Sequence, residues 1–211
     1  MVGTIVSTAG KIFWRRLGLM VVANVLWLLM SLPIVTWPAA TAGLFALVRR
    51  VVTEELDDVT LETRIGDFWD GFRAHWQRGT LVTLLDLAGV GIIVVAFIFY
   101  GRSSVEPLRW LVGPIALVLI AWLAANLYVY PLLLHRRFSS AWEVLREALL
   151  VALAYPLTSL SLLITSLVLA VPAIVLAGPV LFVFFSAMAT LQTVALRQIL
   201  IDRGERQEVS A

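Results

Sequence analysis

Four polar side chains interrupt apolar runs that are long enough to cross a membrane: Asn24, Asp86, Asn126 and Gln192. Because a polar group in hydrocarbon is costly, such residues are the first candidates for a functional role. Asp86 is the one acid inside an apolar run. It can pair with an arginine at the membrane interface, or it can line a water-filled cavity on a proton or substrate path. The three amides can instead be satisfied by hydrogen bonds across helix interfaces, which is a structural role.

The sequence offers little other chemistry. The two histidines, His75 and His135, stand in no His-x-x-x-His or His-Glu-x-x-His frame, and the chain has no cysteine. We therefore expect no metal site and no disulfide. The sequence also has no phosphate-binding Gly-x-x-x-x-Gly-Lys-Ser/Thr loop and no Gly-x-Ser-x-Gly nucleophile elbow. Asp86 and His75 are the only plausible acid–base pair, so we expect neither a cofactor nor an enzyme.

The composition indicates that these residues lie in a lipid bilayer and not in water. Of the 211 residues, 61% are hydrophobic and only 14% are charged, whereas soluble domains carry about 25% charged residues. The apolar residues come in blocks of about 20, the length needed to cross ~30 Å of hydrocarbon. We predict an all-α, polytopic membrane protein with one membrane domain over residues 1–211.

Apolar runs place six membrane-spanning helices at about residues 17–35, 39–52, 80–100, 110–134, 148–171 and 180–201. The basic start of the chain before the first run also resembles a secretory signal peptide, but further spans follow at once, which favours an uncleaved first span. The second span is short. Its small residues Ala39, Ala42, Gly43 and Ala46 predict close packing against another helix.

The one long polar stretch, residues 53–79, contains an aromatic-rich segment. At 100° per residue, its apolar side chains fall on one face of a helix over about residues 64–78. That face comprises Ile65, Phe68, Trp69, Phe72 and Trp76. We predict an interfacial amphipathic helix, begun by Asp67 as N-cap, whose face contacts lipid headgroups or a partner. Further along, Ser140 and Glu143 match the capping box of another helix.

Basic residues predict the orientation. Fourteen of the 16 Lys and Arg residues lie in the N-terminus, the loops after the second and fourth spans, or the C-terminus; only Arg102 and Arg109 lie on the opposite side. Because Lys and Arg stay on the cytoplasmic side, we expect a multi-pass protein of the bacterial cytoplasmic membrane with both termini in the cytoplasm. No basic stripe lies outside the membrane-flanking segments, so we expect a lipid bilayer and no nucleic acid as partner.

The first 80 or so residues resemble a known family. The resemblance begins with Asn-Val-Leu-Trp-Leu-Leu-Met-Ser-Leu-Pro-Ile-Val-Thr over residues 24–36, continues through Ala39–Gly43 and Arg49-Arg50, and ends with the aromatic segment at Thr80. These motifs are similar to those of the YesL family, small bacterial membrane proteins of uncharacterised biochemical function. The chain departs from the family pattern at Trp37-Pro38, where Ile-Gly is expected.

The resemblance implies a role but no mechanism. Members of the family are often encoded beside ABC-type carbohydrate uptake systems, which implies an accessory or regulatory component of sugar import with ABC transporter subunits as partners. The resemblance leaves undecided whether the protein forms a homo-oligomer. The family has no established catalytic residues that could be transferred to this sequence. The alternative is a small solute transporter or channel, with Asp86 and Asn126 on its path between proline-broken spans.

The topology can be tested on a background free of cysteine. Cysteine introduced at Ser104 should react with a membrane-impermeant maleimide in intact cells, because residue 104 lies in the expected outer loop. Cysteine at Ser210 should react only after permeabilisation. The reverse labelling pattern would contradict the predicted orientation.

Overall fold

The computed structural model of the protein describes residues 2–58, 62–136, 138–175 and 181–204. Residue 180, the predicted start of the sixth span, and Ser210 lie outside these ranges. Within them every regular element is a helix, so the predicted all-α class is confirmed. The elements are α1 (Val2–Arg15), α2 (Leu17–Ser31), the short 3-10 helix η1 (Ile34–Thr36), α3 (Trp37–Asp57), α4 (Gly66–Gly101), α5 (Glu106–Arg109), α6 (Val112–His135), α7 (Ala141–Ala154), α8 (Pro156–Val175) and α9 (Leu181–Asp202).

Four segments of the described chain are long and apolar enough to cross a membrane: Gly66–Gly101, Glu106–His135, Pro156–Ala173 and Phe182–Asp202. A fifth candidate is the pair α1 and α2, which meets the criterion together but is bent by 90°. Exposed side chains such as Ile92, Phe99 and Ile164 give these helices apolar outer surfaces that suit lipid. The chain is a helical membrane protein, and the predicted count of six spans is not confirmed.

Three predicted spans need correction. The run at 148–171 is broken at Tyr155, between α7 and α8, because the Pro156 ring disfavours a helical conformation at the preceding residue. The run at 39–52 lies in α3, which carries charges in its second half and is not a candidate span. The run at 17–35 ends earlier, at Ser31, and η1 follows it.

The predicted interfacial helix at 64–78 and the predicted third span at 80–100 form one continuous helix, α4. Gly79 does not interrupt it, because this glycine is buried where the backbone of α4 passes close to Pro38. Asp67 is not the N-cap. It lies in the first turn, where its carboxylate accepts a hydrogen bond from the Arg64 N–H at 2.8 Å. Ser140 caps α7 as predicted, since its hydroxyl accepts from the Glu143 N–H at 3.3 Å.

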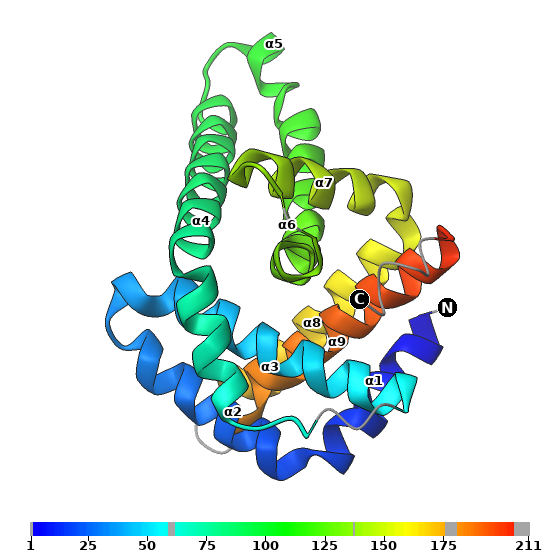
Figure 1. The fold of residues 1–211 in the computed structure, drawn as a ribbon. Coiled ribbons are helices and arrows are strands. Elements are labelled where there is room, and N and C mark those ends of the chain that lie inside the picture. Colours follow the sequence, from blue (N-terminus) through cyan, green and yellow to red (C-terminus); the bar gives the residue numbers. More distant parts are fainter. Residues whose placement is uncertain (1, 59–61, 137, 176–180, 205–211) are drawn as a thin grey trace.

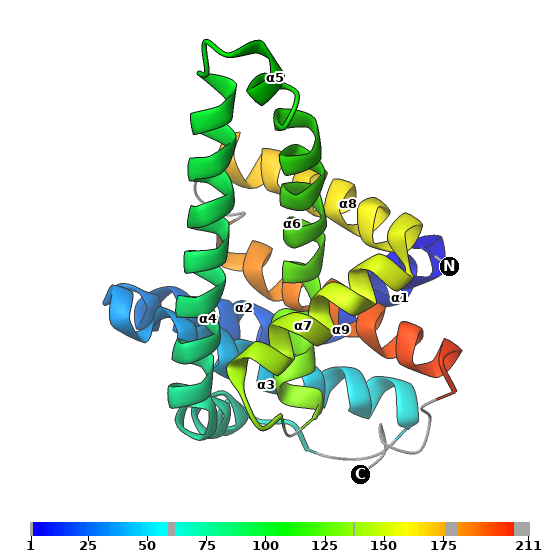
Figure 2. The same cartoon turned by 90° about the horizontal axis from the view of Figure 1, so that it is seen from above.

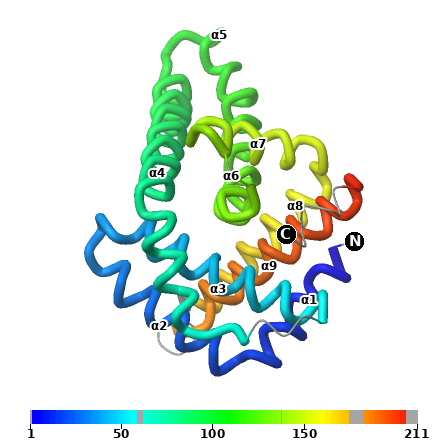
Figure 3. The backbone as a smooth tube through the Cα atoms, in the orientation of Figure 1, coloured from blue at the N-terminus to red at the C-terminus, as the bar shows by residue number. Residues whose placement is uncertain are grey.

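Helix α3 lies at the centre of the fold and contacts α2, α4, α6 and α9. In Figures 1 and 2, α4 and α6 run side by side away from this centre, with α5 at their tip. Figure 3 shows α9, in orange and red, passing along α3 toward α1, both of which it contacts. Because α3 is covered by four helices, eleven of its residues are buried, on more than one face.

Helices α3 and α4 approach each other through small residues, as the pattern at Ala39, Ala42, Gly43 and Ala46 predicted. A Cβ atom on Gly43 would lie 2.7 Å from the carbonyl oxygen of Phe68, and one on Gly71 would lie 2.3 Å from the Cβ of Ala46. Both distances are shorter than real Cβ contacts, so glycine is required at these two positions for the backbones to pass at this distance.

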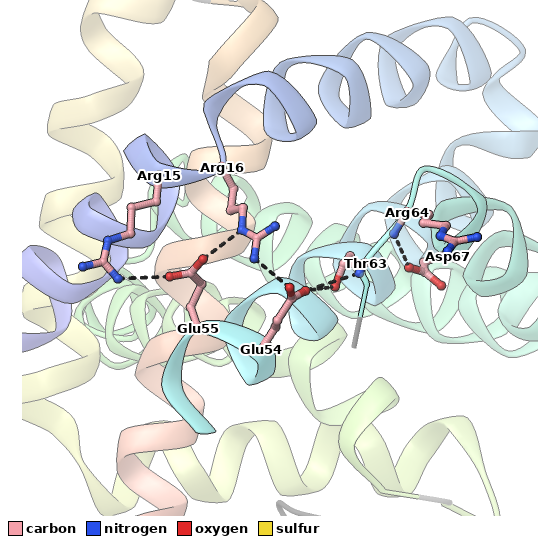
Figure 4. Close-up of polar contacts among 7 residues, drawn as sticks. All are labelled: Arg15, Arg16, Glu54, Glu55, Thr63, Arg64 and Asp67. Atoms are coloured by element: carbon pink, nitrogen blue, oxygen red, sulfur yellow. Dashed lines mark hydrogen bonds and ion pairs between the residues drawn. The ribbon is translucent and has the colours of Figure 1, made fainter. Parts of the chain in front are cut away.

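A cluster of charged residues ties the start of α2 to the end of α3 (Figure 4). Arg16 donates to Glu55 at 2.8 Å and to Glu54 at 2.7 Å, and Arg15 donates to Glu55 at 3.2 Å. The Thr63 hydroxyl donates to Glu54 at 2.6 Å and thereby fixes the segment that leads into α4. Hydrogen bonds from Thr63 lower the pKa of Glu54, and those from Arg16 lower the pKa of Glu55, so both carboxylates are ionised at neutral pH.

Gly71→Ala should destabilise the protein, because the added methyl group must push α3 and α4 apart. The expected loss is about 1–3 kcal/mol relative to Gly91→Ala, a matched control on the same helix with nothing within 4 Å of the added Cβ. Both variants gain the same helix propensity. Denaturation midpoints of the detergent-solubilised proteins measure the difference, and equal midpoints would contradict the close crossing.

Candidate functional site

The polar residues of α4 and α6 face one another in matching order. Thr83 and Asp86 on α4 are three residues apart, and Trp122, Asn126 and Tyr130 on α6 follow at intervals of four. Residues at these spacings share one face of a helix. Since the two helices run antiparallel, Thr83 meets Tyr130, and Asp86 meets Asn126 and Trp122.

Asp86 is half-buried, and two donors converge on its Oδ1 atom. The indole Nε1 of Trp122 donates at 2.8 Å and the amide Nδ2 of Asn126 donates at 3.0 Å. Among the described residues no arginine or lysine forms an ion pair with Asp86, so the interfacial ion pair considered above is not formed. Within the described parts of the chain the carboxylate is held by neutral donors, which leaves it able to bind a further donor or a cation.

Tyr130 joins this seam to α3. Its hydroxyl lies 2.7 Å from the Thr83 hydroxyl and donates at 3.4 Å to the carbonyl of Pro38. Its ring stacks on Phe45 of α3, with centroids 5.5 Å apart and an interplanar angle of 13°. Tyr130 therefore fixes the distance between α3, α4 and α6 at the level of Thr83.

A cavity of about 520 Å³ opens beside Asp86, among α2, α3, α4, α6 and α9. We call it the solute cavity. Its polar lining comes from α3, α4, α6 and α9, and the aromatic part of its wall includes Trp27, Trp37 and Phe185. The hydrogen-bonding side chains that line it, apart from the indoles, are Thr41, Thr83, Asp86, Asn126, Tyr130 and Gln192. The volume lies within the range of small-molecule sites.

The structure brings together three of the four intramembrane polar residues singled out in the sequence. Asp86, Asn126 and Gln192 line the solute cavity from three different helices. Asn24 does not line it. This residue is fully buried between α2 and α9, where its Oδ1 atom accepts a hydrogen bond from the Ser186 N–H at 2.9 Å. Asn24 therefore has the structural role considered above for the amides, a hydrogen bond across a helix interface.

The aromatic residues predicted to form an interface are divided by the fold. Phe68 is fully buried against α3 and cannot contact lipid or a partner, which corrects the predicted face. Trp69 and Phe72 are half-buried, and Trp76 is exposed. Because α4 packs along α3, the inner part of this aromatic face is buried, and only its outer edge is accessible to lipid or a partner.

Asp86 and His75, the only plausible acid–base pair in the sequence, do not lie close together. His75 and Asp86 lie 11 positions apart on α4, about 16 Å along its axis, and the His75 ring lies instead 3.2 Å from the Gly71 carbonyl oxygen. In the described parts of the chain, no three His, Cys, Asp or Glu side chains are placed to hold a metal.

Thr83, Trp122 and Tyr130 complete the site, although sequence reasoning did not single them out. Indole and phenol groups are common in membrane helices, and threonine is a frequent packing residue there. The available signal was spacing, since Trp122 and Tyr130 stand four residues on either side of Asn126, and Thr83 stands three before Asp86.

Gly89→Ala should disturb Asp86 without changing any polar residue. A Cβ atom at Gly89 would lie 2.5 Å from Cζ2 of Trp122, so the indole must move away from the carboxylate. We expect the Trp122 indole N–H resonance, assigned through Trp122→Phe, to shift upfield as its hydrogen bond lengthens. Gly91→Ala, with open space around the added methyl, is the matched control. An unchanged resonance in Gly89→Ala would contradict the bond between Trp122 and Asp86.

Comparison with known proteins adds a family of unknown function. A family model described as "Protein of unknown function, DUF624" matches residues 20–97. No curated protein matches the chain, and no solved structure matches it. The matched segment reaches from α2 to α4 and includes Asn24, Gly43, Gly71 and Asp86. In this segment, which holds the close crossing and the carboxylate of the solute cavity, the chain is similar to that uncharacterised family.

Proposed function

We propose that this membrane protein binds a small polyhydroxylated solute, a sugar, in the solute cavity. One observation carries the proposal: Asp86, Asn126 and Gln192 converge on one cavity from α4, α6 and α9, and all three helices are candidate membrane spans. Polar groups are costly in such segments, and packing alone does not explain why three of them share one open space.

The lining suits a sugar chemically. A carboxylate accepts hydrogen bonds from hydroxyl groups, and the Gln192 amide can both donate to them and accept from them. The two N–H groups of Asn126 already donate to Asp86 and to the Trp122 carbonyl, so Asn126 offers its amide oxygen as an acceptor. The indole rings of Trp27 and Trp37 offer flat apolar surfaces for the C–H faces of a sugar ring. A largely apolar wall with a few convergent polar groups is the usual composition of a small-molecule site.

A second candidate is the accessory role beside ABC-type carbohydrate uptake that the YesL resemblance implies. The surface at the start of α4 favours it. Trp76 is 37% exposed there, and a hollow of about 380 Å³ is lined by Phe72, Arg73, Ala74, Trp76, Gln77 and Arg78. An exposed aromatic residue flanked by arginines is typical of a protein contact surface. In this role the cavity senses the sugar, and a transporter subunit moves it.

Asp86→Asn should weaken sugar binding, because the charged acceptor for a hydroxyl becomes a neutral amide. We expect a loss of about tenfold to a hundredfold in affinity, measured by equilibrium binding of radiolabelled mono- and disaccharides to the purified protein. Asp70→Asn, an exposed acid on the same helix, is the matched control and should bind as the wild type does. If no sugar binds to the wild type, or if organic ammonium ions bind in preference, the sugar proposal is wrong.

The same variants separate the two functions. Wild-type protein alone in proteoliposomes should accumulate the bound sugar if it is a transporter, and Asp86→Asn should not. If the protein binds sugar without moving it, while deletion of the gene lowers sugar uptake by cells, the accessory role is favoured. Phe72→Ala with Trp76→Ala should then release a copurifying transporter subunit and leave sugar binding by the protein intact.

A further inference from the structure

A second, smaller cavity follows the solute cavity along α3, α6 and α9, three of the five helices that surround the solute cavity. It is lined by residues of α3, α6 and α9 that lie about one to two turns beyond those of the solute cavity, and Phe45 lies on the wall of both. We call it the basic pocket, because its polar lining includes Arg49, His135 and Arg197. All three residues belong to the side of the molecule that the distribution of basic residues predicts to be cytoplasmic.

Arg197 has hydrogen-bonding capacity that the described chain does not use. Its side chain is only 13% exposed, and its Nη2 atom pairs with Asp57. The Nε and Nη1 atoms are buried and have no hydrogen-bond partner among the described residues. Leaving buried donors of a charged group unsatisfied is destabilising, and such groups in a native structure call for an explanation such as a bound ion or water.

The charge of the pocket distinguishes an ion from water. Arg49 is half-buried and donates to the carbonyl of Leu134 at the last turn of α6. No acidic side chain among the described residues pairs with Arg49, so Asp57 is the one carboxylate set against two guanidinium groups. Water would satisfy the free donors of Arg197 but would leave this excess positive charge uncompensated, whereas an anion would satisfy both.

The space is small but open. About 30 Å³ is available to the centre of a water molecule in the pocket, more than the ~10–15 Å³ that a single water needs. A single phosphate group matches this size, and its oxygens match the guanidinium donors, since charge-assisted hydrogen bonds from arginine to phosphate are short and strong.

We propose that the basic pocket is an oxyanion site that binds one phosphate group through Arg197, with Arg49 supplying the second positive charge. The site is separate from the solute cavity, and the inference does not depend on the function proposed for that cavity. The phosphate can come from the cytoplasm as inorganic phosphate or from a lipid headgroup, because both present the same oxygens to the pocket.

The test is the thermal unfolding of the detergent-purified full chain, with inorganic phosphate added at constant ionic strength and sodium chloride as reference. Phosphate at about twenty times its Kd should raise the Tm of the wild type by about 5 °C, because a ligand that binds only the folded state stabilises it. Short-chain phosphatidylglycerol and phosphatidylcholine, added in place of phosphate, separate the sources. A larger shift with either lipid than with inorganic phosphate identifies a headgroup as the ligand.

Arg197→Gln should abolish the shift from either source, and Arg197→Lys, which keeps the charge and can keep the pair with Asp57, should retain part of it. Arg203→Gln is the matched control: it removes an arginine that directly follows α9, pairs with Glu147 of α7 and lies outside the pocket, and it should shift as the wild type does. If neither phosphate nor either lipid raises the Tm of the wild type above the chloride reference, or if Arg197→Gln shifts as fully as the wild type, the inference is wrong.

Discussion

The close crossing of α3 and α4 sets the position of every group around Asp86. In lipid there is little hydrophobic force between helices, so association depends on van der Waals contact and hydrogen bonds, and small residues allow the most contact. Gly43 and Gly71 bring the two backbones together near the start of α4. Thr83 follows one turn beyond Gly79, which passes close to Pro38 of α3, and Asp86 follows next, so the crossing fixes which side of α3 the carboxylate faces.

The sequence predicted the helices better than their ends, for identifiable reasons. Polarity changes sharply between residues 53–79 and the apolar run after them, and that change indicated two elements. A helix needs only its own backbone hydrogen bonds to continue, however, and α4 passes from one environment into the other without a break. Pro156 was visible inside an apolar run, but whether a proline kinks or ends a membrane helix depends on what its neighbours can satisfy, which the sequence does not contain.

The candidate site was partly predictable because polar side chains inside an apolar membrane helix carry a free-energy cost. Cost alone identified Asp86, Asn126 and Gln192, and it also identified Asn24, which holds α2 to α9 instead. The distinction between them depends on the partner, since Asn24 meets a backbone N–H in a filled interface and the others meet open space. Trp122 and Tyr130 carry no such cost at membrane depth, so only the register of α4 against α6 makes them part of the site.

The two cavities share one wall residue, Phe45, which lies between them. Phe45 lies on the wall of both and stacks on Tyr130, whose hydroxyl is tied to Thr83 and to the Pro38 carbonyl. A solute passing from one cavity to the other would have to displace this ring. Because packed interiors move between discrete arrangements and do not deform continuously, moving Phe45 requires Tyr130 to give up its stacking partner. The hydrogen bonds that position Tyr130 against α3 and α4 therefore also keep the solute cavity apart from the basic pocket.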